Sequence, residues 1–551
     1  MKAYIRIVQI SLVFVVVLIG SCTKDFEKIN KDPNRATEVQ TPYILTQVQR
    51  NIAETYFDSW QGFRMNGVIA QHWVQRTYVE EDLYDFSART GTVSNFFNRT
   101  YTFSELANQI IKINENTNAS AYGDPKLQVA TVKILNAWLV FQNARTFGDV
   151  PYTEANDFLN FPTPKYDTQE FIFKDLIRVL KEVNADLQDA VNMKGWTSGD
   201  ILLGGNAEKW RRFANSLRLQ IAMNMIHVEP SLSATEADAA IADGVMRDNA
   251  DNAVFRFISA GNPNQHPNFG DYASRMDFLP SWQFVNLLHG RDDDNKGFVN
   301  PFNGIVDPRF VQFVQSPADQ AAGLTPRFDA IPMGLNRTNN DAVWGILSTD
   351  TRITYGPTAN RLDDILPKPI HAAMWSTFMD YANVALFVAE RQLNKGNAAE
   401  CRDLYENAVQ SSMVVWGIPE ADATAYVTAV MAKFDAAMDN EAKFEMIITQ
   451  KYIHNFAQLD QENLFEYRRT EYPKSVVKPG ERTGGTYTIG GTPMTFTFTP
   501  MSYHGSNSFL QRMKYPSTEA RFNKNNLDEA IKSIGGDTQS IPLYYSKQYK
   551  K

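Results

Sequence analysis

Cysteine is nearly absent from this chain of 551 residues. Only Cys22 and Cys401 are present, so at most one disulfide bond can form. Exported proteins often rely on disulfides, but a chain of this length can bury a sufficient core without them. If Cys22 carries a lipid, Cys401 has no partner, and we expect no intramolecular disulfide. The length would allow two or more domains, yet no linker rich in Pro, Ser or Gly divides the chain.

Long apolar runs are also lacking. After Leu12–Ile19 no comparable uninterrupted run recurs, and this one is too short to span a bilayer, which needs about 20 apolar residues. With Lys2 and Arg6 before it, the run predicts a secretory signal. The tetrapeptide Ile-Gly-Ser-Cys ending at Cys22 resembles a bacterial lipobox. We therefore expect a lipoprotein signal peptide over residues 1–21 and lipidation of Cys22; the alternative is an ordinary signal peptide with an incidental cysteine.

Lys and Arg are fewer than Asp and Glu in this chain. The chain holds 54 Lys and Arg against 62 Asp and Glu, a net charge of −8, and loss of residues 1–21 would lower it to −10. Nucleic-acid affinity comes largely from Lys and Arg neutralising phosphates, so nucleic acid is not an expected partner.

Familiar catalytic and metal-binding motifs are missing. The seven histidines are scattered, and no zinc-protease, nucleophile-elbow, Walker or dinucleotide-binding motif occurs. Asp292–Gly297 resembles part of a calcium loop, but Lys296 and Asn303 stand where an oxygen ligand and the bidentate Glu are needed, so a solvated turn is favoured over another calcium site. We expect no catalytic residue, metal or cofactor. A glycosidase carboxylate pair stays open, because its members meet in space rather than in sequence.

Helical periodicity dominates what is present. Residues 22–41 are polar and predict a lipidated tether, and residues 42–551 are expected to form a single domain. Apolar residues at three- and four-residue steps predict helices that pair as hairpins of the tetratricopeptide kind, although the repeat consensus is eroded. The expected helices cover 127–141, 167–187 with Asp167 as N-cap, 206–225, 376–394, 398–416 and 435–459. The fold class is therefore mainly α.

Long irregular stretches separate these helices. Residues 249–370 are rich in Asn, Asp, Gly, Pro and aromatics, and loops of this length are usually functional. Tyr487–Ile489 and Met494–Phe498 alternate around a Gly-Gly pair, which predicts a small β-hairpin. The expected architecture is a helical scaffold with a large loop-rich half.

Aromatic residues are abundant, at 12% of the chain. Tryptophans 138, 210, 375 and 416 lie in predicted helices, which favours the core, whereas others lie in less regular segments. An indole or phenol ring suits the C–H face of a sugar as well as a protein core. The candidate ligand-binding residues are Trp60, Trp73, Arg76, Tyr78, Tyr84 and Trp282. For each one, inward packing is the stronger alternative.

Six motifs occur in the order found in the SusD/RagB family of nutrient-binding lipoproteins of Bacteroidetes, which the chain resembles. They are Arg145–Ala155 (RTFGDVPYTEA), Gly204–Leu217 (GGNAEKWRRFANSL), Asp307–Arg309 with Ile331–Gly334, Thr449–Tyr452, Glu466–Thr470 and Tyr515–Pro516. One departure is Asn383, in the segment Tyr-Ala-Asn, where the family often has Glu. The ligand surface is the most variable part of such proteins, so the resemblance carries over the fold better than the binding residues.

The resemblance implies a tetratricopeptide-like scaffold and a loop-built binding face. It further implies a non-enzymatic lipoprotein at the cell surface, anchored in the outer membrane, that captures oligosaccharides and passes them to a TonB-dependent SusC-like transporter. Gly148, Asp149, Pro151 and Trp210 of the motifs then have structural roles. The alternatives are capture of peptides or protein fragments, a lid without a ligand of its own, and a surface glycan hydrolase.

Overall fold

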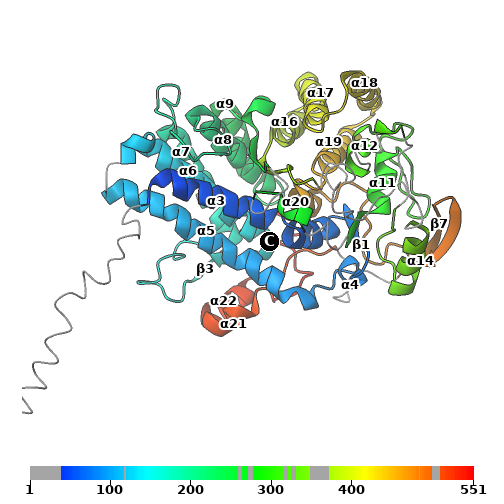
Figure 1. Ribbon diagram of the computed structural model, residues 1–551, viewed down its shortest axis with the longest axis horizontal. Helices are drawn as coiled ribbons and strands as arrows, with labels where there is room; N and C mark the ends of the chain where they lie inside the picture. Colours follow the sequence, from blue (N-terminus) through cyan, green and yellow to red (C-terminus); the bar gives the residue numbers. More distant parts are fainter. Residues whose placement is uncertain are drawn as a thin grey trace, which may run out of the picture.

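The computed structural model describes residues 39–116, 119–258, 264–270, 277–314, 321–323, 330–347, 371–482, 484–498 and 509–550. Cys22 lies outside these residues. Long helices make up most of the structure and pack against one another. Shorter helices and strands lie together near α11, α14 and β7 (Figure 1). The longest are α3 (Thr41–Tyr56), α5 (Thr90–Asn116), α6 (Pro125–Phe147), α7 (Gln169–Asp186), α8 (Ala207–Asn224), α9 (Pro230–Asp243), α16 (Tyr381–Lys395), α17 (Ala398–Val415), α18 (Glu420–Ala436) and α19 (Asn440–His454).

Helices that follow one another along the chain also pack against one another. Contacts join α5 to α6, α6 to α7, α7 to α8 and α8 to α9, and in the second half α16 to α17 and α17 to α18. Helix α16 also contacts α8, α9 and α19, so it connects the two series. The mainly α class is confirmed, and the tetratricopeptide-like detail stays a prediction.

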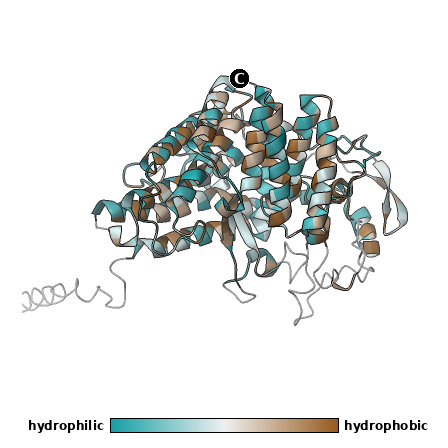
Figure 2. Cartoon of the chain, turned by 90° about the horizontal axis from the view of Figure 1, so that it is seen from above, coloured by the Kyte–Doolittle hydropathy of each residue, from teal (hydrophilic) through white to brown (hydrophobic). Residues whose placement is uncertain are grey.

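Several of the helices are amphipathic, which explains their packing, whereas α6 is buried on nearly all sides. Brown and teal residues lie side by side along them in Figure 2, as expected when one stripe of each helix faces a core. In α7 the buried stripe includes Phe173, Leu176 and Leu180. Its N-cap is Thr168, whose hydroxyl accepts from the Phe171 amide at 3.2 Å. The prediction of Asp167 as the N-cap was therefore wrong by one residue. Asp167 lies in β3 (Tyr166–Asp167).

Three of the four motif residues assigned structural roles occupy such positions, and the fourth, Pro151, lies in the short strand Val150–Pro151. Gly148 ends α6 with φ of 96°, a left-handed conformation that favours glycine. Asp149 Oδ1 accepts from the Gln169 amide at 2.9 Å. Trp210 is fully buried in α8 and donates to Asp200 at 2.8 Å. Gly148 and Asp149 therefore shape the turn after α6, and Trp210 packs in the core.

Four two-stranded antiparallel sheets occur among the described residues. The predicted hairpin is confirmed as β7 (Gly484–Ile489) and β8 (Thr492–Thr497). Two other sheets join segments far apart in sequence, β1 (Trp73–Gln75) with β5 (Phe278–Pro280), and β4 (Ala253–Arg256) with β6 (Trp375–Met379). Strand β6 corrects the prediction of a helix from residue 376, because its backbone pairs with β4. The short β2 (Val150–Pro151) pairs with β3.

Several short helices lie between the long ones. In the described ranges, none of the helices is both long and apolar enough to cross a bilayer. The remaining elements used below are η1 (Ser59–Gly67), α4 (Val79–Asp82), α11 (Trp282–Leu288), α14 (Arg337–Leu347), α20 (Asp460–Thr470), α21 (Ser517–Phe522) and α22 (Lys524–Ser533).

Candidate functional site

The π-helix η1 places an exposed tryptophan above a buried arginine. Asp58 caps this helix, its carboxylate accepting from the amides of Trp60 at 3.0 Å and Gln61 at 2.6 Å. Trp60 and Arg64 are four residues apart, and the Arg64 guanidinium carbon lies 4.5 Å from the Trp60 ring centroid. Trp60 is 40% exposed, whereas Arg64 is 3% exposed. Departures from α-helical geometry of this kind are frequent at functional sites.

Arg64 also supports a second predicted residue, Tyr78. The guanidinium carbon lies 4.8 Å from the centroid of the Tyr78 ring, so one cation contacts both aromatic rings. It is held in place by Glu81 and Asp277, each 3.2 Å away. Burial raises the pKa of Glu81, although the Arg64 charge opposes this shift. We call Trp60, Arg64 and Tyr78 the aromatic platform; sequence reasoning found its two rings and missed the arginine beneath them.

A surface pocket of about 410 Å³ opens beside the Trp60 ring. Gln61, at 2% exposure, lines the pocket, and within the described part of the chain its Oε1 has no hydrogen-bond partner. Arg89 and Arg99 contribute cations to the wall, and Arg89 pairs with Glu81 and lies 4.7 Å from the Tyr78 centroid. The other lining residues are Thr55, Asp58, Ala88, Gly91, Thr92 and Asn95. Hydroxyl, amide and guanidinium groups beside an open indole ring suit a ligand with many hydroxyls.

Arg76 forms a second stacked pair nearby. Its guanidinium carbon lies 4.3 Å from the ring centroid of Trp344 in α14, and both residues are half-buried. The Arg76 amide donates to the Asp277 carbonyl at 2.7 Å, while the Asp277 side chain pairs with Arg64. Asp277 thus links this pair to the aromatic platform. Trp344 was among the tryptophans in less regular segments, but nothing in its spacing indicated Arg76 as a partner.

Trp73 does not lie on the binding face, contrary to prediction. It is 1% exposed and stacks between Phe63 and Phe456, with centroid distances of 4.3 and 4.6 Å. Its Nε1 donates to Asp460 at 2.9 Å. A side chain at Gly67 would place its Cβ 2.4 Å from the Trp73 ring, so the packing there requires glycine. Trp73 is therefore a core residue.

Tyr84 is likewise a core residue and not a surface one. It is fully buried, and its hydroxyl accepts from Gln71 at 2.9 Å and donates to the Ile69 carbonyl at 3.3 Å. Trp282 is partly buried at the start of α11 and meets Tyr487 of β7 edge-on, with 4.7 Å between centroids. It does not line the pocket beside Trp60. Of the six predicted ligand residues, Trp60 lines the pocket, Tyr78 contacts Arg64 and Arg89 beside it, and Arg76 adjoins this platform through Asp277.

A second pocket, of about 610 Å³, lies between α19, α20, the segment after α20 and residues 296–301. Its charges are largely paired, since Lys474 contacts Glu445 at 2.7 Å and Lys478 contacts Glu471 at 3.5 Å. Its tyrosines, Tyr467 and Tyr472, are no more than 5% exposed. This pocket is larger than the one beside Trp60 but offers no open aromatic face.

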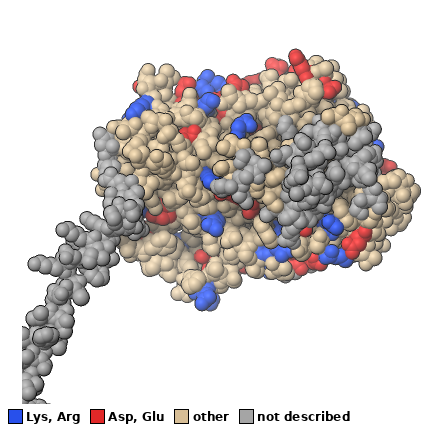
Figure 3. All heavy atoms as spheres, in the orientation of Figure 1, with Lys and Arg blue, Asp and Glu red and all other residues tan. Residues whose placement is uncertain are grey.

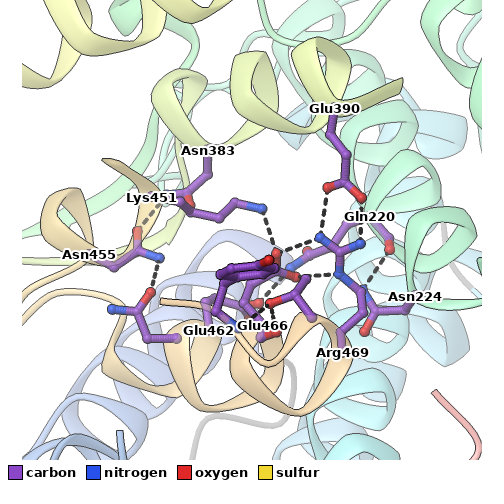
Figure 4. Close-up of polar contacts among 12 residues, drawn as sticks. Gln220, Asn224, Asn383, Glu390, Lys451, Asn455, Glu462, Glu466 and Arg469 are labelled. Atoms are coloured by element: carbon purple, nitrogen blue, oxygen red, sulfur yellow. Dashed lines mark hydrogen bonds and ion pairs between the residues drawn. The ribbon is translucent and has the colours of Figure 1, made fainter. Parts of the chain in front are cut away.

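Buried charges form a separate network where α8, α16, α19 and α20 meet (Figure 4). Arg469 contacts Glu390 at 2.6 Å and Glu466 at 2.7 Å, and Lys451 contacts Glu466 at 3.1 Å. Burial opposes ionisation of Glu466, but the charges of Arg469 and Lys451 lower its pKa to about 2. Burial lowers the pKa of Lys451 to about 8. These carboxylates are paired and inaccessible, so they do not form the acid and base pair of a hydrolase.

Asn383 lies at the edge of this network. Its Nδ2 donates to Asn455 at 2.7 Å (Figure 4). The same nitrogen donates to Asp380 at 3.0 Å. The Asn383 side chain therefore makes two hydrogen bonds at the position where the family often has Glu.

Charge does not separate into a single-sign patch on the face shown in Figure 3, where cationic and anionic residues are intermingled with broad uncharged areas. The described residues contain no group of three or more His, Cys, Asp or Glu arranged to hold a metal ion. The candidate site thus offers a ligand an aromatic ring, hydrogen-bonding side chains and the guanidinium groups of Arg89 and Arg99.

Comparison with known proteins identifies the family. Functionally curated protein sequences include no match to this chain. A solved SusD homolog from Bacteroides uniformis is 22% identical, with a TM-score of 0.67 over 92% of this chain and 99% of that one. A chitin-binding SusD homolog from Flavobacterium johnsoniae is 19% identical, with a TM-score of 0.65 over 92% and 97%. At these identities the likeness establishes the fold. Residues 33–489 match the SusD-like family, described as starch-binding and associating with the outer membrane, and the chain belongs to this family.

Proposed function

We propose that this protein captures oligosaccharides at the cell surface and does not itself catalyse a reaction. The observation that carries the proposal is the open Trp60 ring, stacked on buried Arg64 beside a pocket lined by hydrogen-bonding side chains. The ring offers apolar area to the C–H face of a sugar. Arg89, Asn95 and Arg99 would bond its hydroxyls. The family description, starch-binding, supports a glycan as the ligand.

Binding at this site should be weak. The pocket is an open surface depression with one exposed aromatic face, so little of a long glycan would be enclosed. We expect Kd values from about 1 μM to 1 mM, or roughly 4–8 kcal/mol. Such affinity suits a protein that must release its ligand onward.

The proposal includes anchorage and delivery. A lipid on Cys22 would hold the protein in the outer membrane, residues 23–41 would act as a tether, and a TonB-dependent SusC-like transporter would receive the glycan. The lipobox and the motif order support this part, together with the family description of association with the outer membrane. The charged residues after Cys22 resemble the export signal of surface lipoproteins.

Calorimetry with a panel of oligosaccharides tests the capture site. The panel contains α-glucan and chitin oligosaccharides, with a peptide mixture as the alternative ligand. Trp60→Ala should raise the Kd of the preferred glycan at least tenfold, a loss of about 1.4 kcal/mol, because the stacking face disappears. Tyr43→Ala is the matched control, since Tyr43 is an aromatic residue with 67% exposure outside the pocket. Binding of peptides and of no glycan would overturn the sugar assignment, and an unchanged Kd in Trp60→Ala would overturn the site.

A further inference from the structure

Two guanidinium groups line the pocket beside Trp60. They belong to Arg89, the last residue of the short helix η2 (Ser87–Arg89), and to Arg99 in α5. Ten positions of helix correspond to a rise of about 15 Å, so the two arginines reach the pocket from separate turns of the chain. The hydroxyls of a neutral sugar need hydrogen-bonding groups but no charge, and amides or hydroxyls supply these as well as arginine does. Two cations in one small pocket therefore indicate something more about the ligand.

Arg99 brings an exposed cation to this pocket. Within the described part of the chain its guanidinium makes neither an ion pair nor a hydrogen bond. Its one recorded contact is with the ring of Phe103, whose centroid lies 5.9 Å from the guanidinium carbon. All five N–H donors of Arg99 are therefore free to bind a ligand.

Arg89 is fixed in position but keeps donors to spare. Its Nε donates to Glu81, and its guanidinium carbon lies 4.7 Å from the Tyr78 ring centroid. Its two terminal nitrogens make no hydrogen bond to any residue that the structure describes, and the side chain is 18% exposed. A guanidinium held by a carboxylate and a ring loses little freedom on binding, and its planar fork matches a second oxyanion.

The acids around the pocket already have partners. Asp58 is the one acid among the described lining residues, and its carboxylate accepts from two amides of η1. Glu81 is shared by two arginines, and Glu54 of α3 pairs with Arg50 at 2.7 Å. Residues 80–85 contain further acids, none of which lines the pocket. The lining thus holds two cations against one anion, and that anion is engaged in capping a helix.

We propose that the ligand of this pocket is an acidic oligosaccharide, whose carboxylate or sulfate groups bind Arg99 and Arg89 while one of its rings stacks on Trp60. This inference rests on the proposed function and specifies the class of glycan that is captured. Arginine suits this role because its fork donates two parallel hydrogen bonds to one oxyanion. Because Arg99 is exposed, the attraction is screened by salt, which provides a test of its electrostatic nature.

Calorimetry with matched ligands tests the proposal. Galacturonate oligosaccharides are compared with their carboxyl-reduced form, and sulfated galactan oligosaccharides with their desulfated form. In at least one of the two pairs, we expect the acidic ligand to bind the purified protein at least tenfold more tightly than its neutral form. Raising the salt concentration from about 0.05 to 0.5 M should remove most of this preference. The pair that responds identifies the oxyanion as a carboxylate or a sulfate.

An arginine variant completes the test. Arg99→Gln should raise the Kd of the preferred acidic ligand at least tenfold and change the Kd of its neutral form less than twofold. Arg521→Gln is the matched control, since Arg521 is an exposed arginine of α21 outside the pocket and its loss should leave both Kd values unchanged.

The outcomes separate this inference from the function on which it rests. Equal binding of the acidic and neutral forms would overturn the acidic-ligand inference and leave glycan capture in place, as would an unchanged preference in Arg99→Gln. Binding of no glycan, acidic or neutral, would overturn the proposed function and this inference with it.

Discussion

Two arginines in this protein make similar ion pairs in opposite settings. Arg469 pairs with Glu390 and Glu466 where α16 and α20 meet, and all three residues are at most 3% exposed (Figure 4). Arg64 pairs with Glu81 and Asp277 and is also buried. The difference is what covers each guanidinium. Arg469 is enclosed by helices, whereas Arg64 is covered by the rings of Trp60 and Tyr78, and Trp60 is open to solvent.

The comparison shows how one kind of interaction serves two purposes. Around Arg469 the ion pairs satisfy charges that the packing of long helices has removed from water, so their loss affects stability. Around Arg64 the ion pairs fix a flat cation that orients two aromatic rings, so its loss should affect ligand binding more than stability. Three substitutions or conditions would break or sharpen this contrast.

The largest expected effect is on the helical network. Arg469→Met should lower the free energy of unfolding by about 3–5 kcal/mol, because Glu390 and Glu466 would be left buried without their main cation. Urea unfolding followed by circular dichroism measures this. Arg402→Met is the control, since Arg402 makes a bidentate pair with Asp435 at the surface and should lose less than about 1 kcal/mol. Equal losses in the two variants would contradict the contrast.

The next effect is the acid response of Glu466. Its pKa of about 2 in the folded protein is below the ordinary 4.5, so the ionised form stabilises the fold above pH 4.5. That stability should be lost as the pH falls through 4.5 toward 2, by an amount of about 3 kcal/mol. Urea unfolding at pH 5, 4 and 3 gives the slope. Glu466→Gln lacks this proton uptake and should show a shallower acid dependence than the parent protein; parallel slopes would refute the assignment.

The smallest expected effect is at the aromatic platform. Arg64→Lys keeps the charge beside Glu81 but removes the planar face beneath Trp60, so the glycan Kd should rise roughly five- to tenfold, or about 1 kcal/mol. Calorimetry on the two single variants and the double variant tests whether Arg64 acts through the Trp60 ring. With Trp60→Ala already present, Arg64→Lys should change the Kd no further. An equal effect in both backgrounds would mean that Arg64 contacts the ligand directly.

Local patterns accounted for the helical part of the fold. The cores of α7, α8 and α17 and the hairpin β7–β8 were predicted, because periodicity and turn residues act over a few positions. Strand β6 was missed, since its formation depends on pairing with β4, more than a hundred residues earlier. The predicted N-cap of α7 was one residue early, because Asp167 and Thr168 are equally plausible caps without the contact to β2.

The candidate site was predicted only in part. Residue type indicated Trp60 and Tyr78 as surface aromatics but gave no means to separate them from Trp73 and Tyr84. Arg64 had no distinguishing signal beyond its spacing of four residues from Trp60, and Gln61 had none. Such residues are recognised by their neighbours in space.

By itself the sequence determined the helix-rich class, the expected export signal and membership of a family whose motifs survive in order, because these depend on local composition and spacing. The tertiary structure alone decided which aromatics face solvent. Trp73 is buried because Asp460, 387 residues further along the chain, accepts a hydrogen bond from its indole N–H and Phe456 stacks on its ring. Trp60, thirteen residues before Trp73, lies over Arg64 and stays 40% exposed. Burial is a property of contacts between distant segments, and no local pattern specifies it.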